Sequence, residues 1–250
     1  MLKNVKELYQ MTQDELYDYV KGFLSGRDGF EITENRDGYI VCFPKDIKAP
    51  IPVLSSHLDT VGTVPPDEIV ESDGKYTAKK CGYPCVLGGD DRNGVWTMLK
   101  LIEEGESSWG YIFSRDEEIG RLGADKLVNS GFFEDYKHKI GYFLAIDRKG
   151  KNDLAFYSYY ANGRVHKTKD NDAFITGLQK LKGYSFQRGS ATDITNFCEA
   201  TKLCGINISS GYFMPHSSYE YTDIAYLQRL PEIVKDLISH LGYKQYKVAI

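Results

Sequence analysis

The sequence predicts an α/β protein, a three-layer sandwich with helices on both faces of a central, mostly parallel mixed sheet. Two observations carry this prediction. The 250 residues are 42% hydrophobic and 26% charged, which is typical of a globular fold large enough for such a sheet. Along the chain, an apolar strand-like run is repeatedly followed by a polar cluster and then by a helical pattern. That order is typical of a parallel sheet covered on both faces.

The first predicted elements are a helix and a hairpin. Thr12 and Glu15 form a capping box ahead of apolar residues at helical spacing, so we expect a helix that runs to about Ser25. The runs 30–33 and 39–43 flank a turn signal and predict a hairpin.

The next elements lead to a glycine-rich loop. The run 51–57 predicts a buried central strand, with Pro52 at its entry, where no ladder donor is needed. Residues 68–80 alternate in polarity and predict a small hairpin. The loop 88–94, which holds an acidic pair between glycines, then precedes a helical pattern at 95–102.

Two further buried strands end in acidic residues. The run 109–114 predicts a strand that delivers Asp116–Glu118 at its end, and the segment 120–131 is expected to return as a helix. The run 140–146 predicts another strand, which ends at Asp147.

The remaining elements are predicted from shorter patterns. In order they are a strand (154–159), a helix (172–181), a turn (188–193), a short helix, a strand (203–208) and a terminal helix (223–241). We expect the terminal helix to be interrupted at Pro231, because proline has no N–H to donate.

Charge and hydropathy exclude some partners. The net charge is -4 and the lysines are dispersed, which argues against a nucleic-acid surface. The start has no pattern of a signal peptide, and no apolar run is long enough to cross a membrane. We therefore expect a soluble, cytoplasmic protein with neither nucleic acid nor membrane as a partner. The oligomeric state is left open.

Metal-ligand chemistry is concentrated in separate polar clusters, each after an apolar or strand-like run. They are Ser56–Asp59, Gly88–Gly94, Asp116–Glu118, Ile146–Asp147 and Pro215–His216. In open α/β sheets ligands bind beyond the carboxyl ends of the strands, so we expect these clusters to meet in one crevice.

The spacing within the clusters suits a two-metal hydrolase. In an extended segment His57 and Asp59 lie on the same side, so the carboxylate can orient an imidazole that binds metal. Adjacent carboxylates such as Glu117 and Glu118 diverge, so one can bind metal while the other accepts a proton from water. Taken singly, each pattern also fits an ordinary hydrogen-bonded pair or an exposed acidic turn.

The ordered motifs resemble those of the co-catalytic zinc exopeptidases, most closely peptidase T and its carboxypeptidase and deacylase relatives. The motifs are Ser-His-Leu-Asp-Thr-Val-Gly (56–62), Gly-Gly-Asp-Asp-Arg-Asn-Gly-Val (88–95), Asp-Glu-Glu-Ile-Gly (116–120), Ala-Ile-Asp (145–147) and Pro-His-Ser-Ser-Tyr-Glu (215–220). The resemblance covers roughly residues 40–240. It implies a zinc-exopeptidase, phosphorylase/hydrolase-like fold.

The resemblance also implies two divalent ions, which we expect to be zinc. One ion would be held by His57, Asp90 and Asp147, and the other by Asp90, Glu118 and His216. Asp90 would bridge the two ions, because the family places that ligand four residues ahead of the glycine.

Two further residues receive catalytic roles from the resemblance. Asp59 would orient His57, and Glu117 would be the general base that deprotonates water and returns the proton to the departing amine. The peptide bond between Asp90 and Asp91 is expected to be cis, and the stretch 189–193 is expected to line the substrate side of the site.

The sequence departs from the family in one respect. Peptidase T-like enzymes insert a lid domain after the strand that carries the equivalent of Asp147, and the segment before Gly189 is too short for it. Length alone is compatible with one large domain or two small ones. The layout is similar to that of single-domain zinc aminopeptidases, so we predict one catalytic domain, residues 1–250. Without the lid, Arg148 and Arg188 are the candidate cations for a substrate carboxylate.

Three functions remain open from the sequence. The leading hypothesis is a di-zinc exopeptidase that removes N-terminal residues from short peptides. The second is an N-acyl amino acid deacylase or carboxypeptidase-type amidohydrolase with the same metal centre. The third is a metal-free, non-catalytic binding relative, which the retention of every ligand together with Glu117 disfavours.

Overall fold

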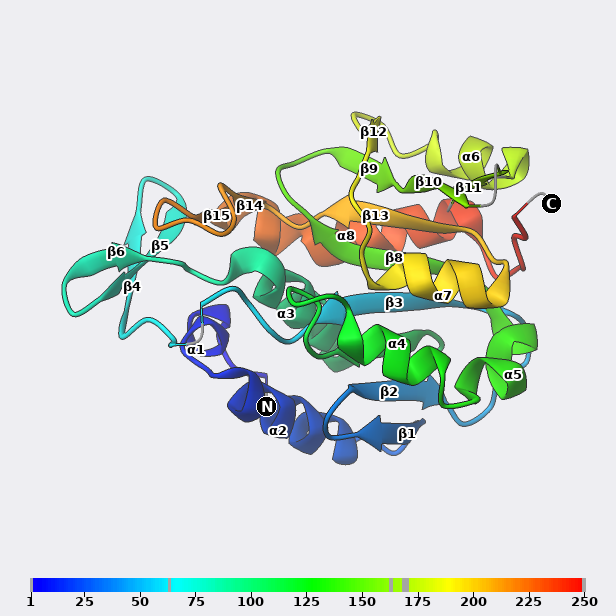
Figure 1. Ribbon diagram of the computed structural model, residues 1–250, viewed down its shortest axis with the longest axis horizontal. Helices are drawn as coiled ribbons and strands as arrows, with labels where there is room; N and C mark the ends of the chain where they lie inside the picture. The colour runs from blue at the N-terminus through cyan, green and yellow to red at the C-terminus, as the bar shows by residue number, and fades with distance from the viewer. Residues whose placement is uncertain (1, 63, 162–163, 168–170, 249–250) are drawn as a thin grey trace.

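The computed structural model describes residues 2–62, 64–161, 164–167 and 171–248. Its centre is an 8-stranded mixed sheet (Figure 1). In spatial order the strands are β1 (Phe30–Asn35), β2 (Tyr39–Pro44), β7 (Gly110–Ser114), β3 (Ile51–His57), β8 (Ile140–Arg148), β13 (Gly205–Ser209), β9 (Asp153–Phe156) and β12 (Ser185–Arg188). The central strands β7, β3, β8 and β13 are parallel, whereas β1, β2 and β9 run antiparallel to their inner neighbours. The predicted fold class is confirmed.

Helices cover both faces of this sheet (Figure 1). One face carries α1 (Val5–Tyr9), α2 (Gln13–Ser25), α3 (Gly89–Glu103), α6 (Asp172–Leu178) and α8 (Ile224–Leu241). The other face carries α4 (Leu122–Val128), α5 (Phe132–Tyr136) and α7 (Asp193–Thr201). A 3₁₀ turn, η1 (Lys137–Lys139), follows α5. Successive side chains of a strand point to opposite faces. Leu54 accordingly lies in one core and Val53 in the other.

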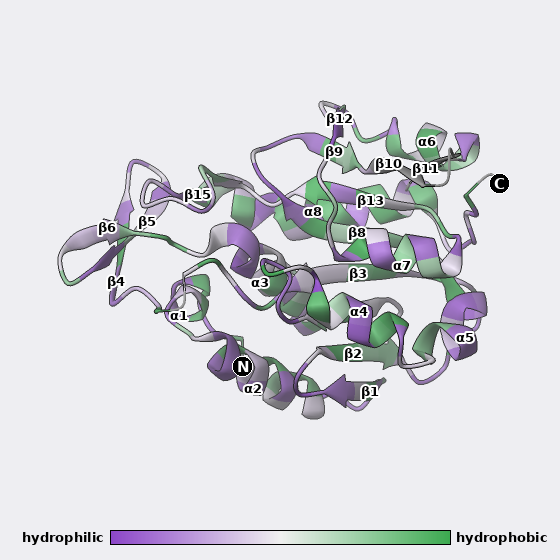
Figure 2. Cartoon of the chain, in the orientation of Figure 1, coloured by the Kyte–Doolittle hydropathy of each residue, from purple (hydrophilic) through white to green (hydrophobic). Residues whose placement is uncertain are grey.

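The N-terminal elements follow their local signals. Thr12 caps α2 through the predicted capping box. The preceding helix α1 was not predicted, although Asn4 and Glu7 form a second capping box there. In the hairpin, β2 is buried throughout, whereas β1 forms the edge of the sheet and is partly exposed. Figure 2 shows the same contrast, with β2 hydrophobic and β1 hydrophilic.

A smaller sheet stands at one end of the main sheet (Figure 1). It consists of β14 (Tyr212–Phe213), β15 (Tyr221–Asp223), β5 (Lys75–Lys80) and β4 (Glu68–Ser72), and β6 (Tyr83–Cys85) pairs with β5. The predicted hairpin at 68–80 is therefore present as β4 and β5. Its pairing with β15, which joins Thr222 to Tyr76, was not predicted.

Three local expectations were wrong. The predicted strand 154–159 ends at Phe156, and a separate strand, β10 (Ser158–Ala161), pairs with β11 (Arg164–Lys167). The turn expected from residue 188 begins only after β12.

The third correction concerns α8, which continues through Pro231. A proline inside a helix costs about 3 kcal/mol. Each fully buried leucine or valine contributes about 1.5–3 kcal/mol, and Leu227, Leu230, Val234 and Leu237 are all buried on α8. Burial on both sides of Pro231 therefore outweighs the lost hydrogen bond.

Within the described residues, no helix is both long enough and apolar enough for a bilayer crossing. The assignment of residues 1–250 to one catalytic domain stays a prediction.

Candidate metal centre

The parallel strands bring three of the predicted clusters to one edge of the sheet. His57 is the last residue of β3 and lies opposite Ser114, the last residue of β7. Asp147 lies near the end of β8, which pairs in parallel with β3 on its other side. The residues that follow β7, Glu117 and Glu118, therefore start from the same edge as His57 and Asp147.

The loop before α3 delivers Asp90 to this edge. Gly88 has a φ of 82°, in the left-handed region that favours glycine, and Asp90 and Asp91 have non-helical backbone angles. The Asp90–Asp91 peptide bond is cis, as the resemblance implied. A Cβ at Gly94 would lie 2.3 Å from the carbonyl oxygen of Ile146, so only glycine lets α3 approach β8 this closely.

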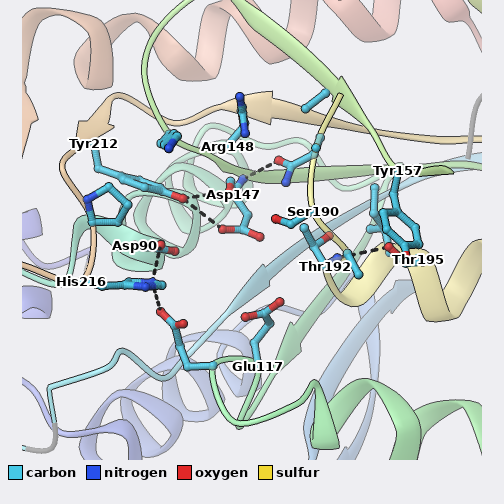
Figure 3. A pocket seen from close by; sticks show the side chains of 18 residues that line it. Asp90, Glu117, Asp147, Arg148, Tyr157, Ser190, Thr192, Thr195, Tyr212 and His216 are labelled. Atoms are coloured by element: carbon cyan, nitrogen blue, oxygen red, sulfur yellow. Dashed lines mark hydrogen bonds and ion pairs between the residues drawn. The ribbon is translucent and has the colours of Figure 1, made fainter. Parts of the chain in front are cut away.

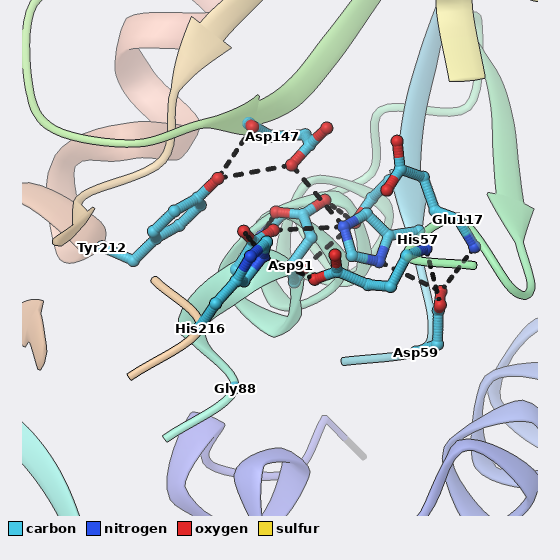
Figure 4. A network of polar contacts seen from close by, with 12 residues as sticks. His57, Asp59, Gly88, Asp91, Glu117, Asp147, Tyr212 and His216 are labelled. Carbon is cyan, nitrogen blue, oxygen red and sulfur yellow. Dashed lines mark hydrogen bonds and ion pairs between the residues drawn. The ribbon is translucent and has the colours of Figure 1, made fainter. Parts of the chain in front are cut away.

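The five predicted metal ligands lie together, and Figure 4 shows three of them, His57, Asp147 and His216. His57 Nε2 lies 3.1 Å from Asp90 Oδ1 and 3.6 Å from Asp147 Oδ1. His216 Nε2 lies 3.3 Å from Asp90 Oδ2 and 3.0 Å from Glu118 Oε1. The two oxygens of Asp90 thus face different histidines, which is the arrangement that a carboxylate shared between two ions requires.

Asp91, the neighbouring aspartate to which the resemblance assigned no ligand role, also reaches this cluster. Ligand atoms of His57, Asp91 and Asp147 lie within 4.8 Å of one another, as do those of His57, Asp90 and Glu118. However, Asp91 accepts hydrogen bonds from Ser56 Oγ and from the backbone N–H of Gly94. Because its oxygens are occupied in this way, Asp90 is the better candidate for the shared ligand.

Asp59 connects the histidine to both glutamates. Its Oδ1 lies 3.1 Å from His57 Nδ1 and accepts the backbone N–H of Glu117 at 3.0 Å. Its Oδ2 accepts the backbone N–H of Glu118 at 2.9 Å. The contact with His57 was predicted, whereas the two contacts with the glutamate backbone were not. Asp59 therefore orients the imidazole and also holds the loop that carries Glu117.

The electrostatics of the cluster suit cations. Burial raises the pKa of Glu117 to about 8 and that of Asp147 to about 7. The negative charges of Asp147, Glu118 and Asp90 add to the rise at Glu117. Glu118 Oε1 is buried and lies 3.0 Å from His216 Nε2. Buried carboxylates that crowd one another are costly when ionised, and a divalent cation among them offsets that cost. These residues therefore fit a metal site, with the donor set of two histidines and several carboxylates that zinc accepts.

A cavity of about 410 Å³ opens beside this cluster (Figure 3). Glu117 lies on its wall and belongs to neither ligand group among the described residues. Of the predicted stretch 189–193, Gly189 to Thr192 line the cavity and Asp193 does not. Asp193 Oδ1 is buried and has no hydrogen-bond partner within the described part of the chain. Burial raises the pKa of Asp193 to about 7, and the charge of Glu117 adds to this shift.

Glu220 is a further residue at this site whose role the sequence did not show. Its carboxylate is 1% exposed and accepts the backbone N–H groups of Leu87, Gly88 and Asp90 at 2.9–3.1 Å. Burial raises the pKa of Glu220 to about 7, while the hydrogen bonds act in the opposite direction. Glu220 therefore holds in place the loop that carries Asp90.

Replacement of Glu220 by alanine is expected to lower the free energy of unfolding by about 2–4 kcal/mol, because buried N–H groups would lose their acceptor. Urea denaturation measures this change. Glu232→Ala is the control, since Glu232 is 73% exposed in its ion pair with Lys235 and a surface pair contributes about 0–1 kcal/mol. Equal effects of the two substitutions would show that Glu220 does not support the loop.

Comparison with known proteins identifies the fold. No family profile and no curated protein sequence matches this chain. Among solved structures, aminopeptidase PepT from Bacillus cereus has a TM-score of 0.72 at 14% identity, with 95% of this chain and 96% of that chain covered. A tripeptidase from Staphylococcus aureus has a TM-score of 0.72 at 16% identity, with 95% and 96% covered.

A third similar structure is described with an activity other than that of a peptidase. A protein from Thermotoga maritima described as an endoglucanase has a TM-score of 0.60 at 11% identity, with 96% of this chain and 99% of that chain covered. At such identities the similarity concerns architecture, and activity has to be argued from the site. This chain has the fold shared by these solved peptidases.

Proposed function

We propose that this protein is a two-metal exopeptidase that releases the N-terminal residue of short peptides. The observation that carries the proposal is Asp90, whose two oxygens face His57 and His216, with the carboxylate of Glu117 on the adjoining cavity wall. The descriptions of two similar structures, an aminopeptidase and a tripeptidase, support the same reaction class.

The proposal assigns one ion to His57, Asp90 and Asp147, and the other to Asp90, Glu118 and His216. We assign both as zinc. When bound, such ions polarise the carbonyl of the peptide and lower the pKa of the attacking water.

The chain's own residues would supply the proton transfers. Glu117 lies on the cavity wall with a raised pKa, so it is suited to accept a proton from water and to donate it to the departing amine. Asp59 would keep the His57 imidazole oriented through the contact at Nδ1. The water adds to the carbonyl carbon, the C–N bond breaks, and the proton held by Glu117 leaves with the amine.

A second candidate function has one observation in its favour. Arg148 and Lys149 line the same cavity, and an N-acyl amino acid hydrolase needs a cation for the free carboxylate of its substrate. A deacylase or carboxypeptidase-type amidohydrolase would use the same ligands and the same general base. The two functions differ in whether the substrate has a free amine.

The deciding experiment compares free-amine and N-acetylated versions of the same di- and tripeptides, with zinc or cobalt present. We expect the free-amine peptides to be cleaved preferentially, because an aminopeptidase site selects the charged amine. Preferential cleavage of the acetylated forms would replace the aminopeptidase assignment with the deacylase one. Cleavage of neither set by metal-loaded protein would contradict both.

A further inference from the structure

Arg148 is a cation with uncommitted donors on the wall of the cavity (Figure 3). It is the last residue of β8 and directly follows Asp147. Its side chain is 21% exposed, and the nearest carboxylate oxygen among the described residues, Asp153 Oδ2, lies 3.8 Å from Nη2. That distance exceeds hydrogen-bonding range. Nε is buried and has no hydrogen-bond partner among the described residues.

These donors are suited to an anion. An arginine carries five N–H donors and remains charged at any physiological pH. Because Arg148 lines the cavity and its side chain is 21% exposed, its accessible N–H groups can donate to a ligand there, and a hydrogen bond to a charged group is among the stronger ones. The planar guanidinium matches a carboxylate in particular, because two parallel N–H groups can bind its two oxygens. Lys149 lies on the same wall and adds a second positive charge.

The position of this cation relative to the metal ligands limits the length of the substrate. Adjacent Cα atoms are about 3.8 Å apart, and an extended peptide advances about 3.3–3.6 Å per residue. Asp147 and Arg148 line the same cavity, so a peptide whose scissile bond lies beside Asp147 would bring a carboxylate to Arg148 after only a few residues. The cavity volume of about 410 Å³ is near the lower end of the range for small-molecule sites, about 300–1,000 Å³.

We propose that Arg148, assisted by Lys149, binds the C-terminal α-carboxylate of the substrate, so that the preferred substrates are free di- and tripeptides. The inference rests on the proposed function for the identity of the substrate. It goes beyond that function in selecting peptides by their length and by a free C-terminus. Arg188, the other candidate in the sequence, is exposed and is not among the residues that line the cavity.

The first test compares each of several tripeptides with its C-terminal amide. With zinc or cobalt present, the wild-type protein is expected to have a kcat/KM for the free acid about 10- to 100-fold above that for the amide, the range for a charge-assisted hydrogen bond. Arg148→Gln should lower kcat/KM for the acid by the same factor, mainly through KM, and lower that for the uncharged amide by much less. Arg188→Gln is the matched control and should keep the wild-type preference.

The second test separates this subsite from the reaction. Calorimetry measures binding of the same acid and amide pairs to the zinc-loaded Glu117→Gln protein, with and without Arg148→Gln. Tighter binding of the acid that disappears with Arg148→Gln supports the subsite even if no peptide is hydrolysed, an outcome that would contradict only the proposed function. Equal binding of acid and amide, or an equal loss for both in the Arg148 variant, would overturn the subsite.

Discussion

Replacement of Glu117 by glutamine is expected to lower kcat by about 10²- to 10⁴-fold, the range that a general acid–base contributes, and to leave the metal content unchanged. Glutamine has nearly the same shape but cannot accept the proton. Glu117 lies on the cavity wall outside both ligand groups, so its loss removes no proposed ligand. Peptide turnover and elemental analysis of the same zinc-loaded preparation measure the two quantities.

Glu118→Gln is the matched control, because it makes the same chemical change in the adjacent residue. Glu118 Oε1 lies 3.0 Å from His216 Nε2, and the proposed site uses it as a ligand. We expect this variant to lose metal as well as activity. If instead Glu117→Gln lost zinc and Glu118→Gln kept it, the roles of the two glutamates would be exchanged.

The site could be predicted from the sequence to the extent that it depends on strand ends. His57, Glu118 and Asp147 follow apolar runs that become parallel neighbours β3, β7 and β8, and the carboxyl ends of parallel strands meet at one edge. Periodicity and turn signals are local, so they identified those runs. The convergence then followed from the fold class.

Contacts between distant segments could not be predicted in this way. Glu220 directly precedes β15, which pairs with β5 in the smaller sheet, and its carboxylate reaches Leu87 and Asp90. No local pattern specifies which short strands pair across such a sequence separation. The approach of Asp91 to the metal cluster depends in the same way on the backbone geometry at the start of α3.

Local propensity was also overridden where burial was large. Pro231 predicted a break in the terminal helix, and the buried face of α8 carries the helix through it. The general rule is that tertiary burial outweighs a single unfavourable residue when several apolar side chains on both sides of it reach the core.

Asp90 gives the second prediction of large effect. After zinc loading, the wild-type protein is expected to hold two ions per chain, and Asp90→Asn at most one. A carboxylate offers one oxygen to each of two ions, whereas the asparagine amide has a single oxygen and no charge. Elemental analysis gives the stoichiometry, and circular dichroism confirms that the variant is folded.

Two further variants show whether the effect belongs to Asp90. Asp91→Asn makes the same change at the neighbouring residue, whose oxygens are hydrogen-bonded to Ser56 and Gly94, and should retain both ions. Asp59→Asn changes only a residue that orients a ligand, so zinc affinity should fall by about 10–100-fold with both ions still bound at saturation. If Asp91→Asn lost both zinc ions and Asp90→Asn kept two ions per chain, the shared ligand would be Asp91. One ion or none in the wild-type protein would refute the two-metal centre itself.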